Sequence, residues 1–124
     1  MMSAAMFAKE PNKLSVAAGD YLFREGDKPD FLYILLSGQG RILVGERQVE
    51  VFNPGQFVGE MALIASAPRT ASVQALTDCE FARIDEKRFH FLVTETPGFA
   101  LAVMRTIAER LSGADRLIGT RDEG

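Results

Sequence analysis

The residues that could do chemistry gather in one short segment, 59–73, which reads GEMALIASAPRTASV. Its first residue, Gly59, has no Cβ, so the backbone there can approach a ligand closely. The apolar run Met61–Ile64 begins with good helix formers and predicts a single helical turn. The free N–H groups at the start of such a turn point to a common position, where they stabilise an anion. The segment is therefore a candidate anion site.

Side chains of the same segment add to those amides. Arg69 supplies a guanidinium, which can hold phosphate oxygens through two parallel hydrogen bonds, and Pro68 stiffens the backbone before it. Glu60 adds a carboxylate, and Thr70 adds a hydroxyl. Taken singly, such residues are common as first-turn acids, solvated cations or strand residues. In this order and at this spacing they suit a phosphate joined to a sugar.

The segment resembles the phosphate-binding cassette of cyclic nucleotide-binding domains, which occur in the catabolite activator protein, kinase regulatory subunits and nucleotide-gated channels. The resemblance extends from about Leu14 to Leu117. It implies that Glu60 accepts a hydrogen bond from the ribose 2′-hydroxyl and that Arg69 pairs with the cyclic phosphate. The apolar wall of the fold would take the base. The residues expected to contact the ligand are Gly59, Glu60, Met61, Ala62, Arg69, Thr70 and Ala71.

Composition places the chain among ordinary soluble proteins. Its 124 residues are 47% hydrophobic and 25% charged, which indicates one domain over 1–124 with a core of its own. The net charge of −3 argues against nucleic acid as a partner. No signal peptide and no bilayer-spanning stretch is recognisable, so we expect no membrane association. The single cysteine, Cys79, excludes an internal disulfide, suits buried packing and favours a cytoplasmic location.

Short apolar runs separated by turn residues fill the chain from about 14 to 84, a texture typical of a small all-β sandwich or barrel. The resemblance implies a jelly-roll-like β-roll. The turn at 53–56 contains Pro-Gly, the signature of a type II turn. In the run 48–52, polar residues alternate with valines, which predicts one wet face. Strands are predicted at 21–23, 31–36, 40–44, 48–52, 71–76 and 79–84, with Phe57 and Val58 leading to the cassette.

From Asp85 to about 118 the apolar period becomes helical and predicts two helices divided near Pro97. A shorter helical lead-in is predicted at 3–9 with Ser3 as its cap, and a frayed tail from Gly119. One stripe on the second helix should pack on the β-roll: Ala100, Val103, Ile107, Leu111, Ala114 and Leu117.

The resemblance implies two further roles for the second C-terminal helix, as a lid over the base or as a contact with a partner subunit. The adjacent Thr-Ser pair with which the catabolite activator protein contacts adenine is absent, because Thr106 and Ser112 are separate. Arg105 or Arg110 could cap the base instead. Thr70 could serve the phosphate or reach the 2-amino group of guanine. From the resemblance we expect the ligand to be cAMP or cGMP, and cAMP is the favoured hypothesis.

Catalysis is not expected. A metal-dependent enzyme on a small β-roll needs clustered imidazole and carboxylate ligands, but the chain has one histidine, His90, on a predicted helix. No zinc spacing, P-loop or dinucleotide glycine pattern is present, so we expect no metal. Four arginines and four acids follow Pro97, which makes no basic DNA-recognition surface.

Two functions remain open. The first is a stand-alone cyclic-nucleotide sensor that signals through its C-terminal helix to a downstream protein or to a second copy of the chain. The alternative is a structural or protein-interaction module that keeps the fold without ligand-driven switching.

Overall fold

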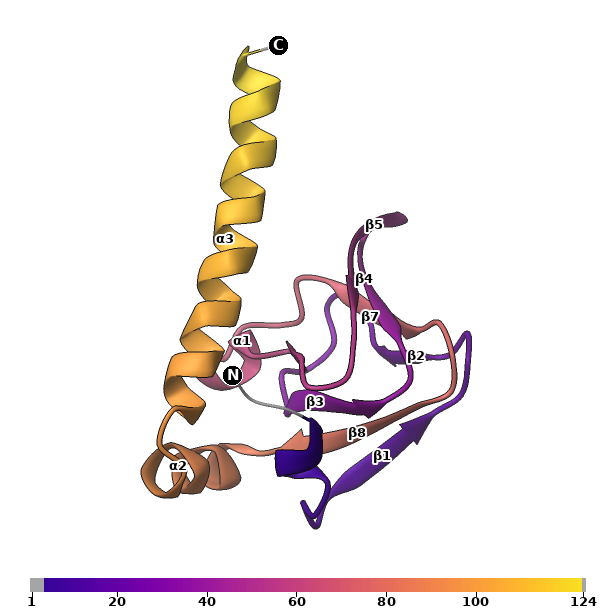
Figure 1. The fold of residues 1–124 in the computed structure, drawn as a ribbon. Helices are drawn as coiled ribbons and strands as arrows, with labels where there is room; N and C mark the ends of the chain where they lie inside the picture. The colour runs from indigo at the N-terminus through magenta and orange to yellow at the C-terminus, as the bar shows by residue number, and fades with distance from the viewer. Residues whose placement is uncertain (1–3, 124) are drawn as a thin grey trace.

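The computed structural model describes the backbone of residues 4–123 and the side chains of residues 4–61 and 63–112 (Figure 1). This part of the chain forms a β-roll followed by two helices, as the sequence predicted. The helical elements are η1 (Ala4–Phe7), α1 (Met61–Ile64), α2 (Glu86–Glu95) and α3 (Phe99–Glu123). The strands are β1 (Lys13–Val16), β2 (Tyr21–Phe23), β3 (Leu32–Ser37), β4 (Gly40–Val44), β5 (Arg47–Phe52), β6 (Phe57–Val58), β7 (Ser72–Ala75) and β8 (Cys79–Ile84).

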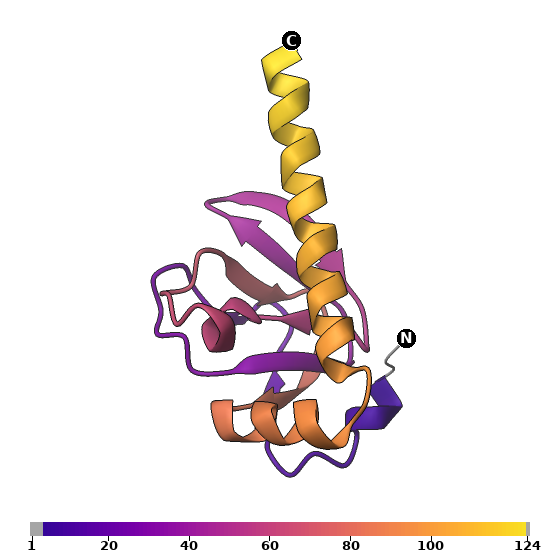
Figure 2. The ribbon, with the colours of Figure 1, turned by 90° about the vertical axis from the view of Figure 1, so that its left-hand side faces the viewer.

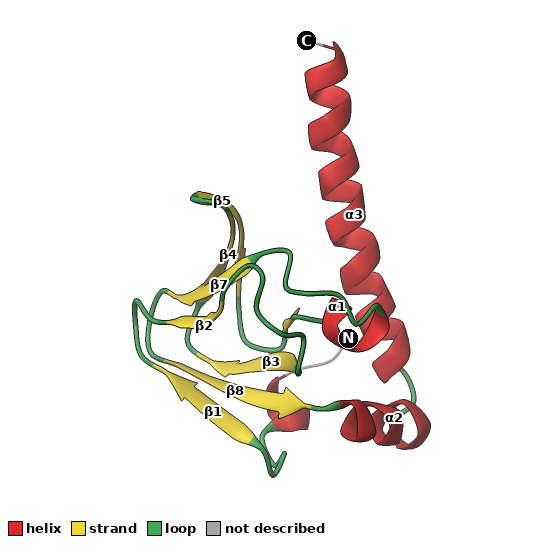
Figure 3. Ribbon diagram, turned by 180° about the vertical axis from the view of Figure 1, so that it is seen from behind, coloured by secondary structure: helices red, strands yellow, loops and turns green. Residues whose placement is uncertain are grey.

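The strands form two four-stranded antiparallel sheets that face each other (Figures 1 and 3). Their orders are β1-β8-β3-β6 and β2-β7-β4-β5. Aromatic and β-branched residues fill the space between them, as expected for strands buried on one face. The fully covered members are Leu35, Phe52, Val58, Val73 and Phe81. This core fixes the ends of β6 and β7, and therefore the two ends of the segment between them.

A second apolar cluster lies where the helices cover the β1-β8-β3-β6 sheet, with α2 lying across its end (Figure 2). Phe99 at the start of α3 packs against Phe7 and Phe57, with ring centroids 6.0 and 5.9 Å apart. The carboxylate of Asp85 caps α2 by accepting a hydrogen bond from the backbone N–H of Arg88 at 2.7 Å. The first turns of α3 are thereby fixed to the β-roll.

Several local predictions are confirmed. Strands 21–23 and 40–44 have the predicted bounds, and the Pro-Gly turn has Gly55 at φ 92° with the N–H of Gln56 donating to Asn53 O. Cys79 is buried, and burial raises the pKa of its thiol. The lead-in helix is present as η1, while its predicted cap, Ser3, lies outside the described residues.

The strand at 48–52 exposes one face, as predicted, although polarity alone does not indicate which face. Val49 and Val51 are 47% and 37% exposed, whereas Glu50 is half-buried and Phe52 is fully buried. Side chains alternate along a strand, so the burial of Phe52 forces Glu50 onto the same inner face. The valines therefore form the wet face of this edge strand.

The predicted apolar stripe of the last helix is only partly correct. Val103 is buried and Ile107 half-buried, but Leu111 is 60% exposed. The side chains of Ala114 and Leu117 lie outside the described residues. The helix also continues to Glu123, so the predicted end near Gly119 is wrong, because one glycine weakens a helix without breaking it. In Figure 1 the second half of α3 extends beyond the β-roll.

Candidate functional site

A cavity of about 320 Å³ opens between the segment after β6 and the middle of α3. Its walls are mostly apolar and come from β2, β4, β6, β7 and α3. The charged groups that reach it are Glu60, Arg69 and Arg110. The other lining residues are Phe23, Ile42, Val58, Gly59, Met61, Ala67, Pro68, Thr70, Ala71, Val73, Ile107 and Leu111.

Arg69 is the buried cation of this cavity, with 7% of its surface exposed. Its Nη1 donates to Gly59 O at 3.1 Å, and its Nη2 donates to Phe31 O at 2.7 Å. The guanidinium also lies over the Phe23 ring, 4.1 Å from the centroid. Both hydrogen-bond acceptors are neutral carbonyls, and Nε is buried without a partner. Burial lowers the pKa of Arg69 more than the nearby acids Asp30, Asp27 and Glu60 raise it, and none of these acids is hydrogen-bonded to the guanidinium.

Gly59 allows the backbone to pass beside this guanidinium. Its φ of 75° lies in the left-handed region, which glycine adopts without a steric penalty. A Cβ at this position would lie 2.6 Å from Arg69 Nη1 and 3.2 Å from Phe31 O. The backbone N–H groups of Gly59 and Glu60 donate to no other described residue. Both residues line the cavity.

Glu60 precedes α1 but does not cap it with its side chain. Glu60 is 5% exposed, and its carboxylate accepts a hydrogen bond from Arg110 Nη1 at 2.5 Å. The group expected to bind a ribose hydroxyl is thus buried at the cavity and connected to α3.

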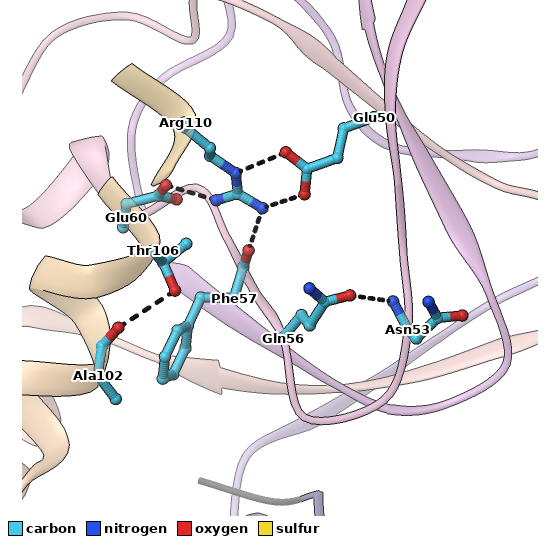
Figure 4. A network of polar contacts seen from close by, with 8 residues as sticks. All are labelled: Glu50, Asn53, Gln56, Phe57, Glu60, Ala102, Thr106 and Arg110. Carbon is cyan, nitrogen blue, oxygen red and sulfur yellow. Dashed lines mark hydrogen bonds and ion pairs between the residues drawn. The ribbon is translucent and has the colours of Figure 1, made fainter. Parts of the chain in front are cut away.

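Arg110 joins three parts of the chain (Figure 4). Its Nε and Nη2 donate to the two carboxylate oxygens of Glu50, each at 3.0 Å, and Nη2 also donates to Phe57 O at 2.7 Å. Burial alone would lower the pKa of Arg110, but its hydrogen bonds and ion pairs with Glu50 and Glu60 outweigh burial and raise it. The arginine is therefore a charged link between α3, β5 and the turn before α1.

The structure brings three of the four remaining sequence-predicted residues to the same cavity. Met61, Thr70 and Ala71 line it, with Met61 46% exposed and Thr70 exposed. The backbone of Ala62 lies in α1, and its side chain is outside the described set.

Of the two arginines that could cap a base, Arg110 reaches the cavity, whereas Arg105 is exposed and is not among its lining residues. Sequence reasoning missed Glu50 altogether. The available signal was its phase with Phe52, which places both on one strand face.

The described residues contain no group of three histidine, cysteine or acidic side chains that could hold a metal ion. His90 is exposed on α2, 3.8 Å from Glu86 one helical turn away. Among residues 4–123, no helix combines the length and hydropathy that crossing a bilayer requires.

Comparison with known proteins decides the family. A family model described as "Cyclic nucleotide-binding domain" matches residues 13–96, more than half of the chain. The chain belongs to this family. The match includes both sheets and the whole segment that contains Gly59, Glu60 and Arg69, while all of α3 lies beyond it.

Individual relatives agree with this assignment. Over 82 residues, 66% of the chain, this cyclic nucleotide-binding domain is 39% identical to a cAMP-dependent protein kinase regulatory subunit of Hypocrea atroviridis, covering 18% of that protein. Over 103 residues, 79% of the chain, it is 31% identical to lysophospholipase nte1 of Aspergillus fumigatus, covering 7% of that protein. The chain therefore spans less than a fifth of either curated relative.

Solved structures share the fold. The crystal structure of the Thermus thermophilus catabolite activator protein superposes with a TM-score of 0.81 at 24% identity, covering 97% of this chain and 63% of that one.

Proposed function

We propose that this domain is a regulatory module that binds a cyclic mononucleotide, cAMP or cGMP, and is not itself an enzyme. The observation that carries the proposal is the Arg69 guanidinium: it is 7% exposed, lines the cavity, and has neutral hydrogen-bond acceptors and an unpartnered Nε. A buried cation without an anion is costly unless a ligand supplies one. The cyclic phosphate is such an anion.

The neighbouring groups suggest how the nucleotide would sit. Its phosphate would pair with Arg69 and accept from the free N–H groups of Gly59 and Glu60. The Glu60 carboxylate has one oxygen bound by Arg110, which leaves the other to accept the 2′-hydroxyl. The apolar walls from β4, β7 and α3 would cover the base. Thr70 and Arg110 are the polar side chains available to contact it.

Signalling would use α3. Arg110 connects α3 to Glu60, so a ligand that binds Glu60 changes a contact of the helix. A ligand shifts such an equilibrium only by its difference in affinity for the two helix positions. We expect amide exchange over 99–112 to differ between the free and the nucleotide-bound protein. Equal protection in both states would leave a binding domain without a switch.

Titration calorimetry with cAMP, cGMP and 5′-AMP tests the binding function directly. Both cyclic nucleotides should bind more tightly than 5′-AMP, and the stronger of the two identifies the preferred base. Glu60→Gln should weaken binding moderately, because an amide oxygen still accepts the hydroxyl hydrogen bond. Glu46→Gln is the matched control, since Glu46 is exposed in the turn after β4. If neither cAMP nor cGMP binds, the proposal is refuted.

A second candidate function is an interaction module that uses α3. Leu101, Met104 and Leu111 are exposed on this helix at 47%, 57% and 60%. Such side chains suit a protein contact. This candidate is favoured over the first if neither cyclic nucleotide binds and the folded domain still associates through α3.

A further inference from the structure

Two arginines reach the cavity, but their surroundings differ. Arg69 donates only to the carbonyl oxygens of Gly59 and Phe31, so its charge is not compensated by a hydrogen-bonded acid. Arg110 donates to the carboxylates of both Glu50 and Glu60. Two acids therefore offset its single positive charge. Without them, the cavity would offer two cations to an anionic ligand.

Glu50 has the larger part in occupying Arg110. It binds Nε and Nη2 together, each at 3.0 Å, and these two N–H groups form the fork with which an arginine holds a phosphate. Glu60 takes only Nη1. Glu50 can reach this position because β5 turns it inward together with the buried Phe52. The pair is partly shielded, with 22% of the Arg110 side chain and 30% of the Glu50 side chain exposed.

The pairing of Arg110 with Glu50 matters because the possible ligands differ in charge. A cyclic nucleotide is a phosphodiester with one negative charge, whereas a 5′-monophosphate carries nearly two at neutral pH, since its second pKa is about 6. A second unpaired arginine would favour the dianion. An arginine whose fork is filled by a carboxylate offers the dianion neither that fork nor an uncompensated charge.

We infer that Glu50 is a specificity-determining residue: by occupying the fork of Arg110 it leaves the anion to Arg69 and favours a singly charged cyclic phosphate over a doubly charged one. This inference rests on the proposed nucleotide-binding function. Glu50 acts through Arg110 and is not itself a cavity-lining residue. It is therefore a positioning residue.

The test compares cAMP with 5′-AMP, which share base and sugar, as competitors of a fluorescent cyclic nucleotide on the full chain. Glu50→Gln removes the charge while keeping one acceptor for Arg110. Because a dianion gains about twice as much as a monoanion from the freed charge, the preference for cAMP over 5′-AMP should fall roughly three- to tenfold. The change should shrink at high salt.

Two variants serve as controls. Glu50→Asp keeps the charge and should retain the wild-type preference. Glu46→Gln removes the same charge from the exposed turn between β4 and β5 and should also retain it. A structural role of Glu50 would change both affinities together and leave their ratio constant, so the ratio distinguishes selectivity from folding.

The inference is overturned if Glu50→Gln leaves the ratio of the affinities for cAMP and 5′-AMP unchanged, or if Glu46→Gln changes that ratio equally. It is also overturned if 5′-AMP does not become a better competitor of the fluorescent nucleotide in Glu50→Gln. Wild-type protein that binds no cyclic nucleotide refutes the proposed function instead. The two failures are therefore separable in one set of titrations.

Discussion

Replacing Arg69 by methionine should separate the cost of burying this cation from its value in binding. Methionine approximates the length of the side chain and can keep a contact with the Phe23 ring, which now lies 4.1 Å from the guanidinium carbon. It removes the charge and both hydrogen bonds, to Gly59 O at 3.1 Å and to Phe31 O at 2.7 Å. The free energy of unfolding and the affinity for nucleotide should respond differently.

For the unliganded protein, two effects oppose each other. Leaving the buried carbonyls without a donor lowers the free energy of unfolding by roughly 1–3 kcal/mol. Removing a desolvated cation that has no hydrogen-bonded acid raises it and offsets part of this loss. We expect the free energy of unfolding to fall by less than about 2 kcal/mol, a shift in Tm of under roughly 10 °C. For binding, loss of a charge-assisted contact worth about 1.5–3 kcal/mol weakens affinity roughly ten- to a hundredfold.

Thermal unfolding without nucleotide and calorimetry with cAMP and cGMP measure the two quantities. Arg83→Met is the matched control, because Arg83 also donates twice, to Asn12 Oδ1, and also lies over a phenylalanine ring, but outside the cavity. It should leave affinity unchanged. A folded Arg69→Met variant with wild-type affinity would refute the assignment of Arg69 to the anion.

Three further results are expected. Gly59→Ala should weaken nucleotide binding by calorimetry and lower the free energy of unfolding by roughly 1–2 kcal/mol, because φ is 75° and the new Cβ would lie 2.6 Å from Arg69 Nη1. Asp85→Ala removes the cap on the N–H of Arg88 and should cost about 0.5–2 kcal/mol in urea unfolding without changing affinity. Burial raises the pKa of the Cys79 thiol above its unfolded value, so its contribution to stability is complete below that value and is lost as pH rises through the folded pKa. Iodoacetamide should therefore label Cys79 slowly at about pH 8 in the folded protein and rapidly in urea.

The fold was predictable because its signals are local. Turn residues divide short apolar runs, and the family resemblance gives those runs a topology. The assembly of Gly59, Glu60 and Arg69 around one cavity follows from a single stretch of 11 residues, so little long-range information was needed to propose it. Whether these residues bind nucleotide stays a prediction.

The errors concern long-range contacts. Polarity alone does not indicate that Val49 and Val51 face outward, because the strand phase is decided by Phe52 and by the pairing of Glu50 with Arg110, which lies 60 residues away. The exposure of Leu111 has a related cause, since the second half of α3 extends beyond the β-roll. Period and composition carry no information on where a helix loses contact with the body of a domain.

The point of attachment of α3 makes the helix a lever. Arg110 lies 13 residues before the end of α3 at Glu123, so about 20 Å of helix follows this contact. A tilt of roughly 10° about that turn displaces the far end by about 3.5 Å, given a rise of 1.5 Å per residue. In the proposed signalling, breaking or remaking the Arg110 contact would therefore be detected as a displacement of the far end of α3.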